Sequence, residues 1–170
     1  VNNDINNYPG IDTDIDPTLT EDFIFNNLNL LNQRCIGPLQ DAFGDIGITS
    51  AYRCKSLNKA LGGVENSQHI KGYAVDLISI GSPSSLLWNW CFQNLPTWNQ
   101  LIWEYPEKGQ FSNSNTNPSW LHISYIEGNN PKITSIATKR EDLHELYIGE
   151  NTYKNGEYTH GITLADENLL

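Results

Sequence analysis

The ten residues Ser67–Asp76, with the sequence SQHIKGYAVD, constrain the fold of this chain more than any other segment. They place His69 seven positions before Asp76, and a second histidine, His122, lies much further along in the apolar run WLHIS. Two imidazoles and one carboxylate are a usual protein ligand set for a catalytic zinc ion, which keeps one further position open. Because these residues come from separate segments, and not from one zinc-binding helix, the fold has to bring distant segments together.

Both segments place a polar residue inside an expected apolar strand. Asp76 interrupts the apolar run 74–78, and a buried unpaired carboxylate is costly unless something binds it. His122 interrupts the strand expected at 120–126 in the same way, on the face opposite to its apolar neighbours. Taken alone, His122 can be a hydrogen-bonded core histidine and Asp76 a turn cap. Together with His69, they favour one zinc ion held by His69, Asp76 and His122.

The remaining pattern indicates an α+β fold, with helices early in the chain and an antiparallel sheet late. Thr18 and Glu21 have the spacing of a capping box that opens the first helix, and Gly37 and Pro38 are expected to break it. Further helices are expected from Pro38 to about Phe43, over 56–61, and from Ser82 and Pro83 onward with Leu86, Leu87, Trp90 and Cys91 as apolar positions. Strands are expected at 46–50, 74–78, 99–104 and 120–126.

Composition limits the classes of partner. The 170 residues are 38% hydrophobic, enough for a core, and 20 acidic against 10 basic residues give a net charge of −10. Nucleic acids and anionic membranes favour a basic surface, and no apolar stretch approaches membrane-spanning length, so we expect no nucleic acid partner and no membrane insertion. The first ten residues do not read as a secretory signal. Cys35, Cys54 and Cys91 are widely spaced, which favours buried free thiols over a disulfide framework.

Three segments differ in character. Residues 1–17, rich in Asn, Asp and Pro, are expected to form an extended N-terminal arm, and residues 18–126 hold the expected core and its site residues. Residues 127–170 carry turn signals and are expected to form a C-terminal extension that packs on the core or contacts a partner. His144 and His160 lie in this extension and are assigned no role.

Glu104 is the candidate general base. If strands 99–104 and 120–126 pair with Glu104 opposite Trp120, then Ile102 faces His122, and Glu104 lies one diagonal step from His122 on the same face. That position suits a carboxylate that removes a proton from a water molecule activated by a metal. Glu107, on the loop that follows, is a weaker candidate. The alternative is that Glu104 is an exposed acid at the end of its strand.

Three further residues are candidates for binding substrate. Arg53 follows the first expected strand, and its guanidinium can hold a substrate carboxylate or carbonyl oxygen, although it can equally pair with a structural carboxylate. Ser67 and Gln68 precede His69 and can orient either that ring or the substrate by hydrogen bonds.

The stretch TSAYRCKSLNKALGGVENSQHIKGYAVDL, followed by NQLIWE and WLHISY, resembles the M15 metallopeptidases. These are the zinc D-Ala-D-Ala carboxypeptidases and related peptidoglycan peptidases, many of them carried by bacteriophages. The resemblance covers about residues 18–126, and its Ser-x-His-x-x-Gly-x-Ala-x-Asp element is specific. It implies His69, Asp76 and His122 as zinc ligands and Arg53 as a substrate contact. It also implies a small antiparallel sheet flanked by helices, a fold shared with the hedgehog signalling domain.

The sequence departs from this resemblance at one position. Several branches of the family place their catalytic acid three residues before the second histidine, where this chain has Ser119. The branch with Trp-x-His-x-Ser instead carries an upstream Gln-Leu-Ile-x-Glu, which matches Gln100 to Glu104. The resemblance therefore implies the same base, Glu104, as the strand pairing does.

The implied function is a zinc-dependent hydrolase, a peptidase that cuts peptidoglycan stem peptides as a D-Ala-D-Ala carboxypeptidase or an endopeptidase. Zinc activates water and polarises the scissile carbonyl, Glu104 transfers the proton, and Arg53 holds the substrate or supports the developing oxyanion. The implied setting is phage-associated cell-wall degradation, as by an endolysin, in a virion or in the host cell, with virion proteins as further partners. The alternative is a zinc-stabilised, inactive structural or recognition domain of a phage particle.

Overall fold

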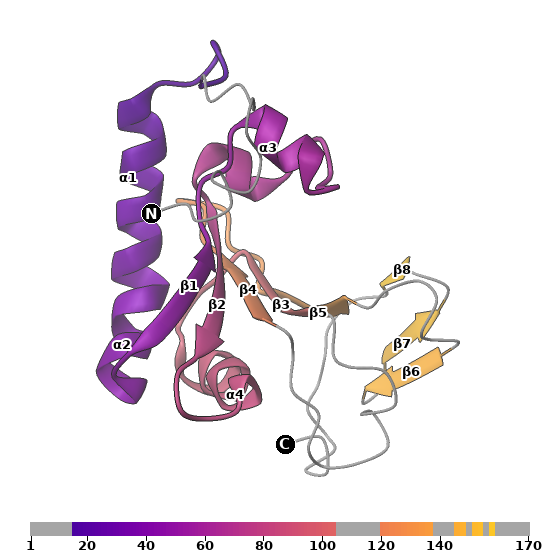
Figure 1. Ribbon diagram of the computed structural model, residues 1–170. Helices are drawn as coiled ribbons and strands as arrows, with labels where there is room; N and C mark the ends of the chain where they lie inside the picture. The colour runs from indigo at the N-terminus through magenta and orange to yellow at the C-terminus, as the bar shows by residue number, and fades with distance from the viewer. Residues whose placement is uncertain (1–14, 105–119, 138–144, 149–150, 155–156, 159–170) are drawn as a thin grey trace.

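Five strands form one mixed sheet in a computed structural model that describes residues 15–104, 120–137, 145–148, 151–154 and 157–158 (Figure 1). The sheet order is β1-β2-β4-β3-β5, from β1 (Ile46–Ser50), β2 (Ala74–Ser79), β3 (Gln100–Glu104), β4 (Trp120–Ser124) and β5 (Ile133–Ala137). All neighbours are antiparallel except β3 and β5, which are parallel. A second, three-stranded antiparallel sheet consists of β6 (Glu145–Ile148), β7 (Asn151–Lys154) and β8 (Glu157–Tyr158).

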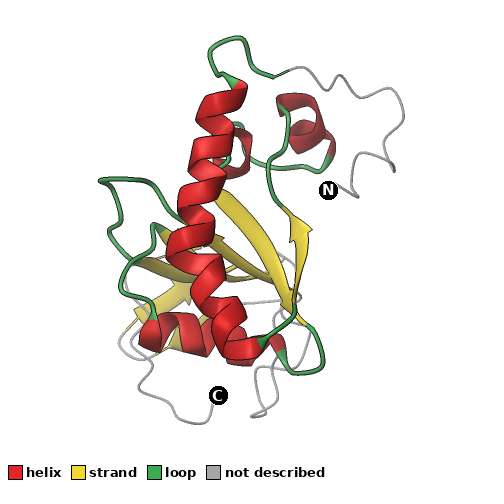
Figure 2. Ribbon diagram, turned by 90° about the vertical axis from the view of Figure 1, so that its left-hand side faces the viewer, coloured by secondary structure: helices red, strands yellow, loops and turns green. Residues whose placement is uncertain are grey.

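The helices lie early in the chain, as the sequence predicts, which confirms the α+β class. They are α1 (Glu21–Leu31), the π-helical turn η2 (Asn32–Ile36), α2 (Gly37–Phe43), α3 (Lys55–Ala60), the 3₁₀ turn η3 (Gln68–Lys71) and α4 (Ser84–Asn94). Figure 2 shows α1 running across the front of the strands. Among the described residues, no helix combines the length and the apolar character needed to cross a membrane.

The core lies on one face of the five-stranded sheet. Alternate residues of β2, β3 and β4 point into it, and α1, η2, α2 and α4 cover it with apolar side chains. The strand residues in this core are Val75, Leu77, Leu101, Trp103, Leu121 and Ile123. Because strand side chains alternate, the residues between these positions point to the opposite face, where the candidate site lies.

The first helix begins and ends differently from the prediction. Its N-cap is Thr20, whose hydroxyl accepts a hydrogen bond from the backbone N–H of Phe23, whereas Thr18 donates to the carboxylate of Asp16. Gly37 and Pro38 do not break the helix, because η2 joins α1 directly to α2. The wider π turn accommodates the proline ring, which would otherwise clash with the preceding turn of an α-helix.

Two further predictions of packing need correction. The buried face of α4 includes Trp88 and not Trp90, which is only partly buried, and Leu86 is exposed. The sheet is not wholly antiparallel, because residues 133–137 add a parallel edge strand from the segment that the sequence assigned to the C-terminal extension.

The expectation of buried free thiols is confirmed for all three cysteines.

Neighbouring leucines of α4 give a matched test of this packing. Leu87 is 0% exposed and Leu86 is 46% exposed. We expect Leu87→Ala to lower the free energy of unfolding by about 3 kcal/mol, because it leaves a cavity in the core. Leu86→Ala should change it by less than about 0.5 kcal/mol, since its side chain already faces water. Urea unfolding measures both, and equal losses would contradict the placement of α4.

Candidate functional site

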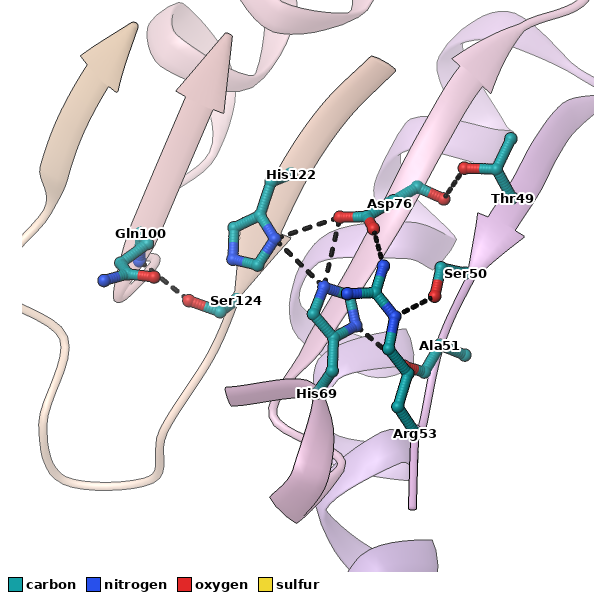
Figure 3. A network of polar contacts seen from close by, with 9 residues as sticks. All are labelled: Thr49, Ser50, Ala51, Arg53, His69, Asp76, Gln100, His122 and Ser124. Carbon is teal, nitrogen blue, oxygen red and sulfur yellow. Dashed lines mark hydrogen bonds and ion pairs between the residues drawn. The ribbon is translucent and has the colours of Figure 1, made fainter. Parts of the chain in front are cut away.

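His69, Asp76 and His122 meet on the face of the sheet opposite the core (Figure 3). Asp76 and His122 lie directly opposite each other on the antiparallel strands β2 and β4, and His69 reaches them from η3. The Oδ1 atom of Asp76 lies 3.2 Å from His69 Nε2 and 3.0 Å from His122 Nδ1, and the two nitrogens are 3.2 Å apart. The structure therefore brings together all three residues that the sequence assigned to a metal.

The donor set and its spacing fit a zinc ion. Ligands placed tetrahedrally at about 2.0–2.1 Å from zinc are about 3.3 Å from one another, close to the three separations found here. All three side chains are buried, and their donor atoms lie within 4.8 Å of one another. Two imidazole nitrogens and one carboxylate oxygen are the chemistry that zinc prefers in sites with an open position.

The tautomer of His69 is fixed by the backbone. Its Nδ1 atom lies 2.7 Å from the carbonyl oxygen of Ala51, which can only accept a hydrogen bond. Nδ1 therefore carries the proton, and Nε2 presents its lone pair to Asp76 and His122. A backbone carbonyl in this position is typical of histidines that bind metals.

The second histidine has one nitrogen in the cluster and one outside it. Nδ1 of His122 faces Asp76, and Nε2 points away from that carboxylate (Figure 3). Nε2 is buried and has no hydrogen-bond partner among the residues that the structure describes. His122 thus offers Nδ1 as its donor atom to the cluster.

Asp76 is held as a carboxylate in a buried place. Burial alone would raise the pKa of its carboxyl group, but the imidazoles of His122 and His69 beside it hold that pKa well below its ordinary value. Its second oxygen, Oδ2, accepts a hydrogen bond from Nη2 of Arg53 at 2.6 Å. Of the two interpretations of Arg53 left open by the sequence, the structure shows the ion pair with a carboxylate, and that carboxylate is the candidate ligand.

Glu104 lies where the assumed strand pairing placed it. Glu104 is opposite Trp120 and Ile102 is opposite His122, which confirms that register. Burial raises the pKa of the Glu104 carboxyl group, and the Asp76 carboxylate adds to the rise, whereas His122 opposes it. A carboxylate with a raised pKa accepts protons more readily near neutral pH. Its role as base remains a prediction, and Glu107 and Ser119 lie outside the described residues.

A cleft of about 800 Å³ opens above the cluster, and its lining includes every described candidate site residue. The loop after α3 contributes Leu61 and Val64, and strands β3 and β4 contribute Ile102, Glu104 and Trp120. Ser67 and Gln68 also line the cleft. The amide of Gln68 donates to the side chain of Asn99, the residue before β3, at 2.8 Å, so the structure ties it to that segment and not to His69.

Three residues of the site were not singled out from the sequence. Thr49, Ser50 and Ala51 lie just before Arg53, separated from it by Tyr52, and each contacts Asp76, Arg53 or His69. Their hydroxyl and carbonyl groups are common in any sequence. The only signal was their position next to a candidate arginine.

Gly72 lets the turn after His69 close against α1. Its φ is 69°, and a Cβ atom there would lie 2.8 Å from the backbone oxygen of Ile24. Gly81 has a similar φ of 83°, but a Cβ atom there would meet nothing within 4 Å beyond its chain neighbours. A substitution at Gly81 therefore measures the cost of the backbone conformation alone, without a steric clash. We expect Gly81→Ala to cost about 1 kcal/mol of unfolding free energy and Gly72→Ala about 3 kcal/mol. Urea unfolding distinguishes them, and equal costs would contradict the close packing at Gly72.

Comparison with known proteins identifies a family for more than half of the chain. The family model described as Peptidase M15 matches residues 12–104. No curated protein matches the sequence. The matched segment contains His69, Asp76, Arg53 and Glu104, and it ends before His122, which joins the cluster through the pairing of β2 and β4.

Proposed function

The chain belongs to the peptidase M15 family, and from this premise we propose that it is a zinc-dependent peptidase that hydrolyses peptidoglycan stem peptides. Peptidases of the M15 family are zinc-dependent. The observation that carries the proposal is the buried cluster of His69, Asp76 and His122 at the base of an open cleft. A metal site inside a cleft is accessible to a substrate, as a catalytic site requires.

The three cluster residues would hold the zinc ion through His69 Nε2, an oxygen of Asp76 and His122 Nδ1. When bound, zinc supplies Lewis acidity, which lowers the pKa of water and polarises a carbonyl group. The ion pair with Arg53 and the hydrogen bond to Ala51 keep Asp76 and His69 in fixed orientations. Such fixed ligands lower the reorganisation that binding requires.

Glu104 takes the proton of the attacking water and returns it to the leaving amine. It lies on the same face of the sheet as His122, and burial raises its pKa toward the range in which proton transfer in both directions is efficient. Its support by the sheet is rigid, because β3 is hydrogen-bonded to a strand on each side.

Arg53 binds an oxygen of the substrate with the N–H groups that its present partners do not use. Nε donates to Ser50 and Nη2 donates to Asp76, while a guanidinium has five N–H donors in total. Arg53 lines the cleft, which supports a role for its remaining donors in holding a scissile carbonyl oxygen or a terminal carboxylate.

The rim of the cleft suits a short peptide with small apolar side chains. Val64 is 73% exposed there, and the buried side chain of Asn58 holds the loop by donating to the Val64 carbonyl oxygen at 2.8 Å. The alanine methyl groups of a stem peptide match such a surface in size and polarity. The resemblance to peptidases carried by bacteriophages supports phage-associated cell-wall degradation as the setting, with Ser67 and Gln68 as further substrate contacts.

Mass analysis of purified peptidoglycan after incubation with the zinc-loaded protein tests this function. Release of free D-Ala would identify a D-Ala-D-Ala carboxypeptidase, and separation of the stem at L-Ala or at a cross-link would identify an endopeptidase. A zinc-loaded wild type that leaves every stem peptide intact would contradict the proposal and favour a structural or recognition domain.

A further inference from the structure

We propose that Thr49 and Ser50, at the end of β1, are positioning residues for Asp76: Thr49 holds its backbone, and Ser50, through Arg53, limits its carboxylate to one metal-binding oxygen. The inference rests on the proposed zinc site, but it concerns residues that no motif assigns. The two residues act on Asp76 from different sides, one through its backbone and the other through Arg53.

A β-bulge brings both residues to Asp76. Along β1 and β2, Ile48 pairs with Leu77 and Ser50 pairs with Asp76, so β1 uses one residue more than its partner. The extra residue, Thr49, donates its hydroxyl to the backbone oxygen of Asp76 at 3.2 Å. Bulges commonly redirect a side chain beside an active site, and here the bulge places Ser50 on the face that carries the cluster.

Ser50 orients the guanidinium of Arg53. The Ser50 side chain is buried, with 6% of the residue exposed, and its Oγ atom accepts a hydrogen bond from Arg53 Nε at 2.7 Å. Nη2 of the same guanidinium donates to Asp76 Oδ2 at 2.6 Å. Because the guanidinium is planar and rigid, fixing Nε fixes the direction in which Nη2 points.

The two carboxylate oxygens of Asp76 therefore have different partners. Oδ2 is occupied by Arg53, whereas Oδ1 faces both histidine nitrogens (Figure 3). An aspartate with one oxygen engaged in this way binds a metal through the other oxygen alone. A single-oxygen ligand keeps the coordination number low and leaves a position for substrate or water.

Loss of the Ser50 hydroxyl removes the acceptor for Arg53 Nε and lets the guanidinium turn away from Asp76. Oδ2 is then released, and both carboxylate oxygens can approach a metal. Outer contacts of this kind change metal affinity by about 10–100-fold when they are removed. We therefore expect Ser50→Ala to weaken zinc binding by about 10-fold and to raise the coordination number.

The test measures zinc affinity by competition with a chelator and records the visible spectrum of the Co²⁺-substituted full chain. Four-coordinate Co²⁺ absorbs more strongly than five- or six-coordinate Co²⁺, so Ser50→Ala should give a weaker band than the wild type. Ser50→Thr, which keeps a hydroxyl, should restore the band. Thr49→Val removes only a hydroxyl from a β-branched side chain and should lower zinc affinity by about 3-fold. This effect is smaller than that of Ser50→Ala, because Thr49 contacts the backbone of Asp76 and not its carboxylate.

Ser124→Ala is the matched control. Ser124 is also buried in the sheet, and its hydroxyl accepts from the backbone N–H of Gln100, so this variant loses a buried serine hydrogen bond that contacts neither Arg53 nor Asp76. It should keep the wild-type affinity and spectrum. Wild-type values for both Ser50→Ala and Thr49→Val, or equal losses in Ser124→Ala, would overturn the inference.

Neither readout requires hydrolysis, so the two proposals fail in different ways. A zinc-loaded wild type that cuts no stem peptide, with Ser50→Ala altered as expected, would overturn the proposed substrate and activity alone. A wild type that binds neither zinc nor Co²⁺ would overturn both proposals.

Discussion

Asp76→Asn should weaken zinc binding by more than about 100-fold, because it removes the one negatively charged ligand. Removing a group that only hydrogen-bonds to a ligand costs up to about 100-fold, and loss of the ligand itself should cost more. The substitution also leaves the Arg53 guanidinium opposite a neutral amide in a site that is largely buried. The free energy of unfolding of the metal-free protein should therefore fall by about 2 kcal/mol. Metal analysis after dialysis measures the first effect, and urea unfolding in the presence of a chelator measures the second.

Asp16→Asn provides the control for this substitution. Asp16 also pairs with a basic side chain, that of Lys55, and contacts with Lys55 and Thr18 lower its pKa to about 2. It does not line the cleft, so its loss should leave the zinc content unchanged. If Asp76→Asn retained zinc as tightly as Asp16→Asn does, the assignment of Asp76 as a ligand would be wrong.

Glu104→Gln should lower the rate of peptide hydrolysis by about 10²–10⁴-fold while zinc stays bound. Glutamine keeps the shape of the side chain but cannot accept the proton of the attacking water. The expected loss lies in kcat, since the substrate contacts and the metal ligands are unchanged. Steady-state kinetics on a stem peptide, together with metal analysis of the same sample, measures both quantities.

Two other acids provide comparisons for this variant. Glu65→Gln changes an exposed acid on the loop after α3 and should keep full activity. Glu107→Gln tests the weaker candidate in the segment that follows β3. Loss of activity in Glu107→Gln with full activity in Glu104→Gln would transfer the role of base to Glu107.

The sequence was most informative where side-chain alternation and chemistry agree. Asp76 and His122 each interrupt an apolar strand. Because they lie opposite each other on neighbouring strands, the two polar side chains contact each other and not the apolar core. The register that places Ile102 opposite His122 was an assumption about the strand pairing, and the structure confirms it. The Peptidase M15 match confirms the resemblance drawn from these motifs.

The features that escaped prediction depend on pairing or backbone geometry. The π turn before Pro38 and the bulge at Thr49 are local adjustments that residue patterns do not encode. The parallel pairing of β5 with β3 joins two strands that are separated in the sequence by β4, and short apolar runs do not specify a partner or a direction. Of these features, the bulge shapes the surroundings of the cluster, so the ligands were predictable and their supports were not.

X-ray diffraction from crystals of the zinc-loaded protein, at wavelengths on either side of the zinc absorption edge, tests the metal site most directly. We expect one strong anomalous peak bordered by His69 Nε2, Asp76 Oδ1 and His122 Nδ1. The absence of a peak at these atoms, or a peak bound by other residues, would contradict the assignment of this cluster as the zinc site.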